Sequence, residues 1–282
     1  MFASFRIVAD VLAYRLKKLE MANLAAATSI AVALHLPFSN VVGRTLFAAA
    51  LNVLVYLNND YVDVGLDMQS TGKDSAKTRF LHEHLGAALG AQWGIVAMLV
   101  VAAVAFDVGL LAPLVFGGGI CVLYSAYLKR RPYVDVPSMM LWGLAMPACG
   151  FPWQSRLGWC LAVELGLFSG VFEAIQVMRD ADEDAIEGVR TTGVVLGKRG
   201  TLTLTRVLMI ISTVFAGVAV HPIAGVLSAG ALAVPFSTED IARYWTRVKL
   251  VYGVTWLFIC AWVFFQGHSQ GLVWSLAASV GE

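Results

Sequence analysis

Residues 42–67 read VGRTLFAAALNVLVYLNNDYVDVGLD, and this stretch decides the fold. Its first part, residues 42–60, is mostly apolar and, at about 1.5 Å per residue, long enough to cross a bilayer as an α-helix. The stretch ends in three carboxylates, Asp60, Asp63 and Asp67. At about 100° per residue, they fall within roughly a 60° arc of one helix face. The sequence therefore predicts a membrane-spanning helix that ends in an acidic face.

A second stretch has the same arrangement. Residues 157–179 are mostly apolar, and DADEDAIEGVRT follows at residues 180–191. Its acids at positions 180, 184 and 187 again share one helix face. Like charges gathered on one face repel each other until a cation neutralises them, and carboxylate oxygens suit Mg²⁺ or Mn²⁺. The predicted metal ligands are Asp60, Asp63, Asp67, Asp180, Asp184 and Glu187.

The composition is that of a membrane protein. Of the 282 residues, 59% are hydrophobic and only 14% are charged, whereas a soluble fold of this size needs far more polar surface. The net charge of +1 argues against a nucleic-acid partner, which would require a basic face. No linker or change in composition divides the chain, so residues 1–282 are predicted to form a single transmembrane domain.

Apolar stretches of membrane-spanning length recur along the chain. We predict an all-α, polytopic membrane protein in which about nine transmembrane helices form a bundle around a central chamber. The predicted spans are residues 21–38, 42–60, 86–106, 109–128, 134–152, 157–179, 201–219, 221–236 and 250–267.

The basic residues indicate how these spans are oriented. Nearly all of the 20 lysines and arginines fall in loops on one side of the predicted topology, while Arg44 and Arg156 fall on the other. The positive-inside rule therefore places the N-terminus and both acidic faces on the cytoplasmic side. We expect a multi-pass protein of the bacterial inner (cytoplasmic) membrane whose acidic site faces the cytoplasm.

The two acidic stretches resemble the signatures of the UbiA superfamily of intramembrane prenyltransferases. Residues 59–67, NDYVDVGLD, are similar to its first signature, NDxxDxxxD. Residues 180–191 are similar to its second, DxxxDxxxGxxT. Tyr124 and Lys129 loosely resemble the tyrosine–lysine motif of the family. Residues 70–79 depart from the Asn-x-Pro-x-Arg-Pro stretch that many members carry, which leaves the acceptor substrate open.

The resemblance implies an intramembrane reaction that depends on two or more Mg²⁺ ions. The ions would bridge the acidic faces to an isoprenyl diphosphate and stabilise the departing diphosphate. An allylic carbocation would then pass to a lipophilic, aromatic or quinonoid acceptor within the bilayer. The implied partners are therefore the isoprenyl diphosphate, a hydrophobic acceptor and the lipid bilayer.

Further candidate residues surround the acidic faces. Loop cations could neutralise phosphate charge, amides on the first acidic helix could reach the metal, and aromatic rings could stabilise the cation. The predicted substrate-binding residues are Asn52, Tyr56, Asn59, Lys73, Arg79, Tyr124, Lys129, Phe172, Gln176 and Arg190. A carboxylate inside a span is costly unless it faces a cavity or a partner, so we predict that Glu173 contacts the acceptor or acts as a base. The predicted catalytic residues are Asp60, Asp63, Asp67, Asp180, Asp184 and Glu173.

Two other functions fit parts of the pattern. An intramembrane terpene cyclase would quench the carbocation within its own prenyl chain, and the divergent loop at residues 70–79 motivates this alternative. An ion or organic-ion transporter would also carry carboxylates within membrane spans. A transport path should, however, distribute its acids across the bilayer, whereas here they gather at one side of the predicted topology.

Overall fold

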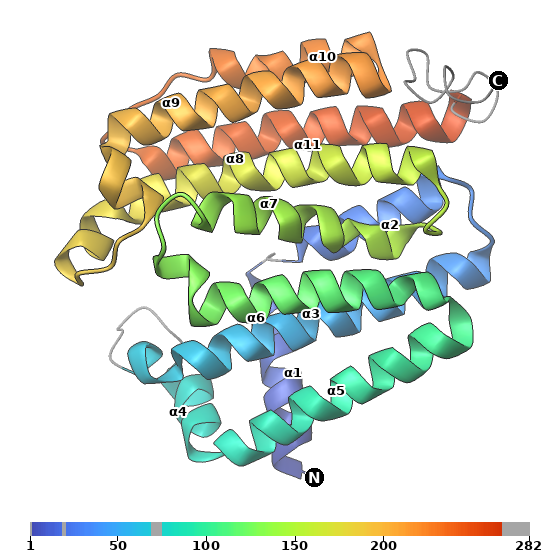
Figure 1. Cartoon of the computed structure of the whole chain (residues 1–282), viewed down its shortest axis with the longest axis vertical. Helices are drawn as coiled ribbons and strands as arrows, with labels where there is room; N and C mark the ends of the chain where they lie inside the picture. The colour runs from blue at the N-terminus through green and yellow to red at the C-terminus, as the bar shows by residue number, and fades with distance from the viewer. Residues whose placement is uncertain (1, 19–20, 69–74, 267–282) are drawn as a thin grey trace.

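The computed structural model describes residues 2–18, 21–68 and 75–266, and every regular element within these ranges is a helix. The α-helices are α1 (Phe2–Lys17), α2 (Ala22–Ala33), α3 (Phe38–Asp67), α4 (Ser75–Glu83), α5 (Leu85–Phe106), α6 (Gly119–Ala126), α7 (Asp135–Ala145), α8 (Arg156–Ile186), α9 (Thr192–Phe215), α10 (Pro222–Ala229) and α11 (Ile241–Gln266). Short 3-10 or π-helical segments are η1 (Val108–Leu110), η2 (Pro113–Gly118), η3 (Leu128–Arg130), η4 (Pro147–Gly150), η5 (Ala216–Val220) and η6 (Gly230–Ala233). The long helices lie side by side along roughly the same axis, with neighbours such as α3 and α5 running in opposite chain directions (Figure 1).

The helices match the predicted membrane architecture. Within the described ranges, six segments are long and apolar enough to cross a bilayer: Phe38–Asp67, Leu85–Phe106, Val108–Ala126, Arg156–Ile186, Thr192–Val220 and Ile241–Phe265. The other three predicted spans coincide with shorter helices, namely α2, α7 followed by η4, and α10 followed by η6. The all-helical membrane fold is therefore confirmed, and the count of nine spans stays a prediction.

Several helix ends differ from the predicted span ends for local reasons. Both acidic stretches lie inside helices, because α3 continues to Asp67 and α8 to Ile186. Pro147 has no backbone N–H, so α7 ends at Ala145 and a 3-10 turn follows. At the start of α9, the chain bends at Gly197, whose φ of 64° is accessible to glycine without a steric cost.

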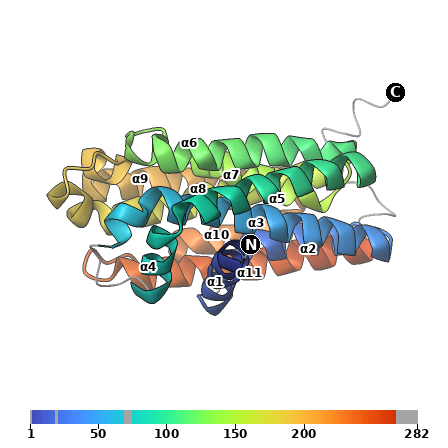
Figure 2. The same ribbon diagram turned by 90° about the horizontal axis from the view of Figure 1, so that it is seen from below.

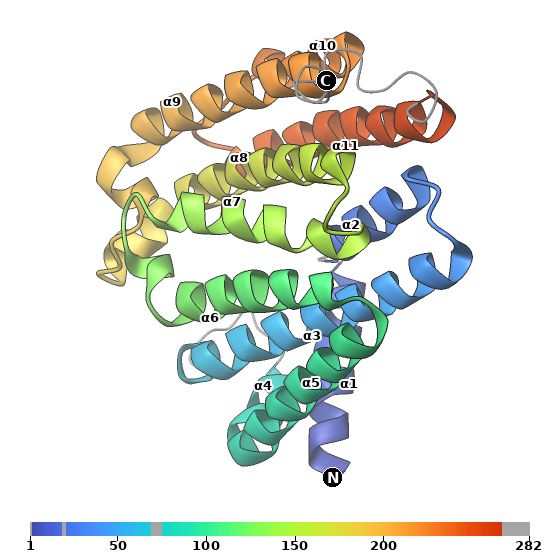
Figure 3. The same ribbon diagram turned by 45° about the vertical axis from the view of Figure 1, so that its right-hand side comes forward.

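Helices α1 and α4 lie outside the predicted spans because neither is apolar along its whole length. Ile7 and Val11 of α1 are buried in a cluster with Leu57 of α3 and Ala88 of α5. Figures 1 and 3 show α1 crossing the direction of the long helices. The polar residues at the C-terminal end of α1 therefore extend beyond the apolar cluster towards the end of α3.

The two acidic stretches lie at the same end of the bundle. Helices α3 and α8 both finish at the left of Figure 1, and we call this the acidic end, defined by residues 60–67 and 180–187. The connection from α8 to α9 projects farthest at this end, as Figure 2 also shows. The topology therefore confirms that the two sequence motifs share one side of the bundle.

A buried arginine ties three segments together near the opposite end. Arg44 of α3 is 2% exposed and donates hydrogen bonds to the carbonyl oxygens of Cys149 (3.2 Å) and Phe151 (2.8 Å). It also forms an ion pair with Asp107, which caps η1 by accepting a hydrogen bond from the backbone of Gly109. Arg44 therefore neutralises Asp107 and satisfies two loop carbonyls at once.

Replacing Arg44 with leucine should lower the thermal unfolding temperature of the detergent-solubilised protein. Loss of the guanidinium leaves Asp107 and the two carbonyl groups without their partner, at a cost on the order of 3 kcal/mol. Arg156→Leu is the matched control, since Arg156 is exposed and lies at the same end of the bundle. It should change stability by less than about 1 kcal/mol. Equal destabilisation by the two variants would contradict the role assigned to Arg44.

Candidate active site

The first acidic face begins with an aspartate that contacts two cations. Asp60 Oδ1 accepts a hydrogen bond from Arg15 Nη2 of α1 at 2.6 Å, and Asp60 Oδ2 accepts one from Lys77 Nζ of α4 at 2.6 Å. The side chains of Arg15, Lys77 and Asp60 are 11%, 12% and 5% exposed. Side chains from three helices, α1, α3 and α4, therefore converge on one carboxylate.

Asp63 has one occupied and one unoccupied oxygen. Its Oδ2 accepts hydrogen bonds from Lys129 Nζ at 3.1 Å and from Asn59 Nδ2 at 3.2 Å. Its Oδ1 is buried and accepts no hydrogen bond from the described residues. The Oδ1 atom of Asn52, about three helical turns earlier on the same face of α3, is also buried without a hydrogen bond. Buried oxygens of this kind suit a hard cation.

The second acidic face is more exposed than the first. Asp180 accepts two hydrogen bonds from its neighbour Arg179, at 2.6 and 3.0 Å. Asp184 Oδ2 accepts a hydrogen bond from Thr191 Oγ1 at 3.0 Å. Asp182 points away, as its spacing predicts, and pairs with Lys198 at 2.6 Å.

The end of α6 connects the two faces. Tyr124 donates a hydrogen bond to Glu173 Oε1 of α8 at 2.6 Å, while the adjacent Ser125 accepts one from Asn59 of α3 at 3.4 Å. Lys129, three residues beyond the end of α6, donates a hydrogen bond to Asp63 at 3.1 Å. The predicted residues Tyr124, Lys129 and Glu173 therefore lie together between the acidic faces.

The remaining predicted residues lie at the margins of this cluster. Asp67 and Gln176 are half-buried, whereas Arg79, Glu187 and Arg190 are exposed. The ring of Tyr56 lies 4.3 Å from the Arg15 guanidinium, and the ring of Phe172 packs edge-on against Tyr252 with centroids 5.8 Å apart. Lys73 lies outside the described residues. Among the described residues, neither Arg79 nor Arg190 forms a hydrogen bond or ion pair with the acidic residues.

The acidic residues do not form a closed metal cage. In the described part of the chain, no three His, Cys, Asp or Glu side chains gather closely enough to bind a metal ion as a group. Basic residues instead contact Asp60, Asp63 and Asp180. The buried Asp63 Oδ1, which accepts no hydrogen bond from the described residues, nevertheless provides the type of donor that Mg²⁺ prefers. This arrangement fits a metal that arrives together with a phosphate-bearing substrate.

Sequence reasoning missed two features of the site. The positive-inside rule accounts for Arg15 by topology alone, and no sequence signal connects it to Asp60, 45 positions away. Asp135 is fully buried and accepts hydrogen bonds from the backbone N–H of Thr192 at 2.7 Å and from its hydroxyl. The Asp135–Thr192 contact fixes the start of α9, beside Thr191 and its bond to Asp184. An isolated acid between Val134 and Val136 was the only available signal.

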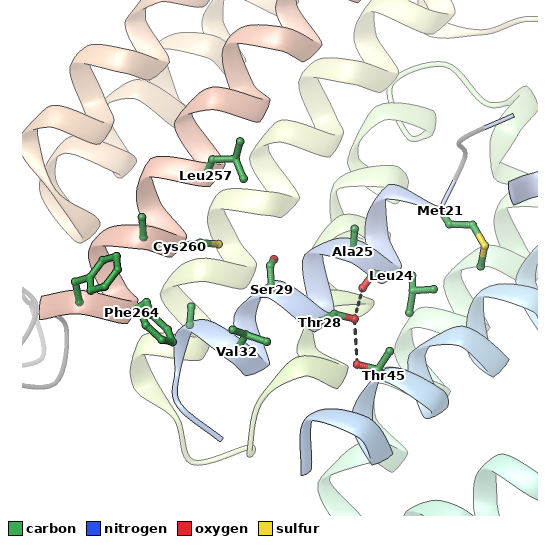
Figure 4. A pocket seen from close by; sticks show the side chains of 13 residues that line it. Met21, Leu24, Ala25, Thr28, Ser29, Val32, Thr45, Leu257, Cys260 and Phe264 are labelled. Carbon is green, nitrogen blue, oxygen red and sulfur yellow. Dashed lines mark hydrogen bonds between the residues drawn. The ribbon is translucent and has the colours of Figure 1, made fainter. Parts of the chain in front are cut away.

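A separate apolar groove opens between α2, α3 and α11 (Figure 4). It has a volume of about 780 Å³ and is lined mainly by apolar residues such as Leu24, Val32 and Phe264. Its few polar groups include Thr28 and Thr45, whose hydroxyls lie 3.1 Å apart. None of the described residues that line the groove is charged, so this lining suits a hydrocarbon chain and not a diphosphate.

Comparison with known proteins gives the same assignment as the two motifs. The sequence pattern of the UbiA prenyltransferase family matches residues 21–249. The chain belongs to this family. The resemblance seen at residues 59–67 and 180–191 is therefore confirmed, and the chain is an integral membrane protein of a family of prenyltransferases.

Solved structures agree on the fold. One, from work on digeranylgeranylglyceryl phosphate synthase in membranes, is 14% identical, covers 93% of this chain and 99% of that chain, and has a TM-score of 0.74. A UbiA homologue from Archaeoglobus fulgidus bound to GPP and Mg²⁺ is 15% identical over 93% of this chain and 98% of that chain, with a TM-score of 0.63. The same homologue bound to DMAPP and Mg²⁺ has a TM-score of 0.61 at 15% identity, over 87% of this chain and 95% of that chain. None of the curated proteins matches the sequence.

Proposed function

We propose that this protein catalyses Mg²⁺-dependent transfer of an isoprenyl group from its diphosphate to a lipophilic, aromatic or quinonoid acceptor. The observation that carries the proposal is the position of Lys129. Its ammonium donates a hydrogen bond to Asp63 of the first acidic face at 3.1 Å, and Tyr124, five residues earlier, donates one to Glu173 of α8, the helix that carries the second face. A cation between two carboxylate faces is suited to a substrate that brings both metal ions and phosphate oxygens.

The chain's own residues have distinct roles in this reaction. Asp60, Asp63, Asp180 and Asp184 would hold two or more Mg²⁺ ions, with Asp67 and Glu187 at the edge of the same faces. When bound, the metal neutralises charge on the departing diphosphate. Lys129 and Lys77 lie beside the first face, where they can contact phosphate oxygens once the metal occupies the carboxylates.

Glu173 and Tyr124 lie deeper than the metal ligands and would act on the acceptor. Glu173 is 7% exposed and precedes Asp180 by about two helical turns, or roughly 10 Å. A carboxylate at this depth can remove the proton that an aromatic acceptor loses when the new carbon–carbon bond has formed. Tyr124, which donates to Glu173 Oε1, orients the carboxylate.

The similar structures bound to GPP or DMAPP with Mg²⁺ support an isoprenyl diphosphate as the substrate. The acceptor, the cytoplasmic orientation and the bacterial inner membrane are parts of the proposal that rest on the sequence. The apolar groove of Figure 4 is consistent with substrates that reach the protein through lipid.

The proposal is tested by measuring diphosphate release from geranyl, farnesyl and geranylgeranyl diphosphates by the purified protein in detergent. We expect release that requires Mg²⁺, stops with EDTA and yields a prenylated product when an aromatic acceptor is added. A cyclised terpene formed without acceptor would identify a cyclase instead. No release with any of these substrates, together with ion flux in proteoliposomes, would favour the transporter.

A further inference from the structure

Helix α1 supplies a residue to the acidic end although it lies outside the family match. The match to the family covers residues 21–249, and α1 ends at Lys17. Arg15 of α1 nevertheless contacts Asp60, an acid of the first signature, at 2.6 Å. We propose that Arg15 is a diphosphate-binding residue, and that its ion pair with Asp60 is exchanged for phosphate oxygens when substrate binds. This inference rests on the proposed function.

The position of Arg15 is fixed by the packing of α1. Ile7 and Val11, eight and four residues before Arg15, are 3% and 1% exposed in a cluster with α3 and α5. Near the start of the helix, Ser4 donates a hydrogen bond to the carbonyl oxygen of Ala87 at 3.1 Å. Because α1 is attached along its length, its last turn is directed at the end of α3 and the guanidinium has a defined place.

The surroundings of Arg15 suit a guanidinium that binds anions. Its side chain is only 11% exposed, and its guanidinium carbon lies 4.3 Å from the centroid of the Tyr56 ring. An arginine stacked on an aromatic ring keeps its planar donors directed sideways, where they can bind a phosphate through two parallel hydrogen bonds. An arginine that serves membrane topology alone has no need of such burial, because it can extend into the headgroup region.

The charges at Asp60 also support a phosphate-binding role for Arg15. The Asp60 carboxylate contacts two cations, Arg15 at 2.6 Å and Lys77 at 2.6 Å. A divalent cation bound at Asp60 would be repelled by both cations unless an anion entered with it. Metal and diphosphate should therefore bind here as a pair, with Arg15 turning from the carboxylate to the phosphate.

Because of this exchange, replacing Arg15 with glutamine should change the affinity for Mg²⁺ and the affinity for pyrophosphate in opposite directions. Removing the guanidinium removes a competitor for Asp60, so Mg²⁺ alone should bind several-fold more tightly. It also removes a phosphate ligand, so inorganic pyrophosphate with Mg²⁺ should bind about tenfold more weakly. A purely structural role would weaken both affinities together.

Binding of Mg²⁺ and of Mg²⁺ with inorganic pyrophosphate is measured by calorimetry and by thermal unfolding in detergent. Lys17→Gln is the matched control, because Lys17 is exposed on the same helix and loses the same charge. It should change either affinity by less than about twofold. Arg15→Lys should recover only part of the pyrophosphate affinity, since lysine lacks the planar donors. Unchanged pyrophosphate affinity in Arg15→Gln, or a parallel loss of both affinities, would overturn the inference.

The outcomes separate this inference from the proposed function. If the wild-type protein releases diphosphate and Arg15→Gln keeps its KM for the isoprenyl diphosphate, the inference fails while the function stands. If pyrophosphate binding depends on Arg15 but no isoprenyl diphosphate is cleaved, the function fails and the anion site stands.

Discussion

Replacing Asp63 with asparagine should lower Mg²⁺-dependent diphosphate release at least about a hundredfold. Asp63 is 6% exposed, and its buried Oδ1 accepts no hydrogen bond from the described residues. A buried carboxylate oxygen without a partner is costly, and a metal ion would remove that cost. Asparagine preserves the size of the side chain but removes its charge and one of its two oxygens. The substitution should therefore destabilise the metal-bound state of the protein and lower the diphosphate release that depends on it.

A conservative change elsewhere in the acidic stretches provides the control. Asp182 has a 76% exposed side chain and pairs with Lys198 on the surface, so Asp182→Asn should alter release by less than about twofold. Release is measured over a range of Mg²⁺ concentrations, and the half-saturating concentration should rise in Asp63→Asn alone. Full activity of Asp63→Asn at low Mg²⁺ would show that Asp63 is not a metal ligand.

Much of the fold follows from simple physical patterns in the sequence. Long apolar stretches predict helices because the bilayer leaves no other partner for backbone polar groups. The acidic motifs end two such stretches and therefore lie at one end of the bundle. The hydropathy pattern does not predict helix α1, because the apolar residues of this helix, such as Ile7 and Val11, form only one stripe. Hydropathy detects spans and is insensitive to helices that lie across them.

Contacts between side chains on different helices could not be predicted from the sequence. A face of α3 can be predicted from spacing, and Glu173 can be selected because acids inside a span are rare. The partner of each acid cannot be predicted in this way. Arg15 and Lys77 meet at Asp60 only because α1 and α4 fold back over α3, and a count of basic residues treats both as topology signals.

Replacing Glu173 with glutamine should separate loss of diphosphate from transfer to the acceptor. Glutamine retains an oxygen that can accept the hydrogen bond from Tyr124, now 2.6 Å from Glu173 Oε1, but it cannot take up a proton. We expect formation of the prenylated acceptor to fall about a hundredfold, as for loss of a general base. The KM for the isoprenyl diphosphate should change by less than about threefold, because Glu173 lies roughly two helical turns from Asp180.

The product ratio is the decisive measurement for Glu173. In the proposed mechanism, ionisation of the diphosphate depends on the metal ligands and not on Glu173, so a carbocation should still form in Glu173→Gln and water should capture it as a prenyl alcohol. The ratio of prenyl alcohol to prenylated acceptor should therefore rise, whereas Tyr124→Phe, which keeps the carboxylate, should lower transfer by only about tenfold. An equal fall in both products would mean that Glu173 acts on ionisation itself. Its negative charge would then matter more than its ability to accept a proton.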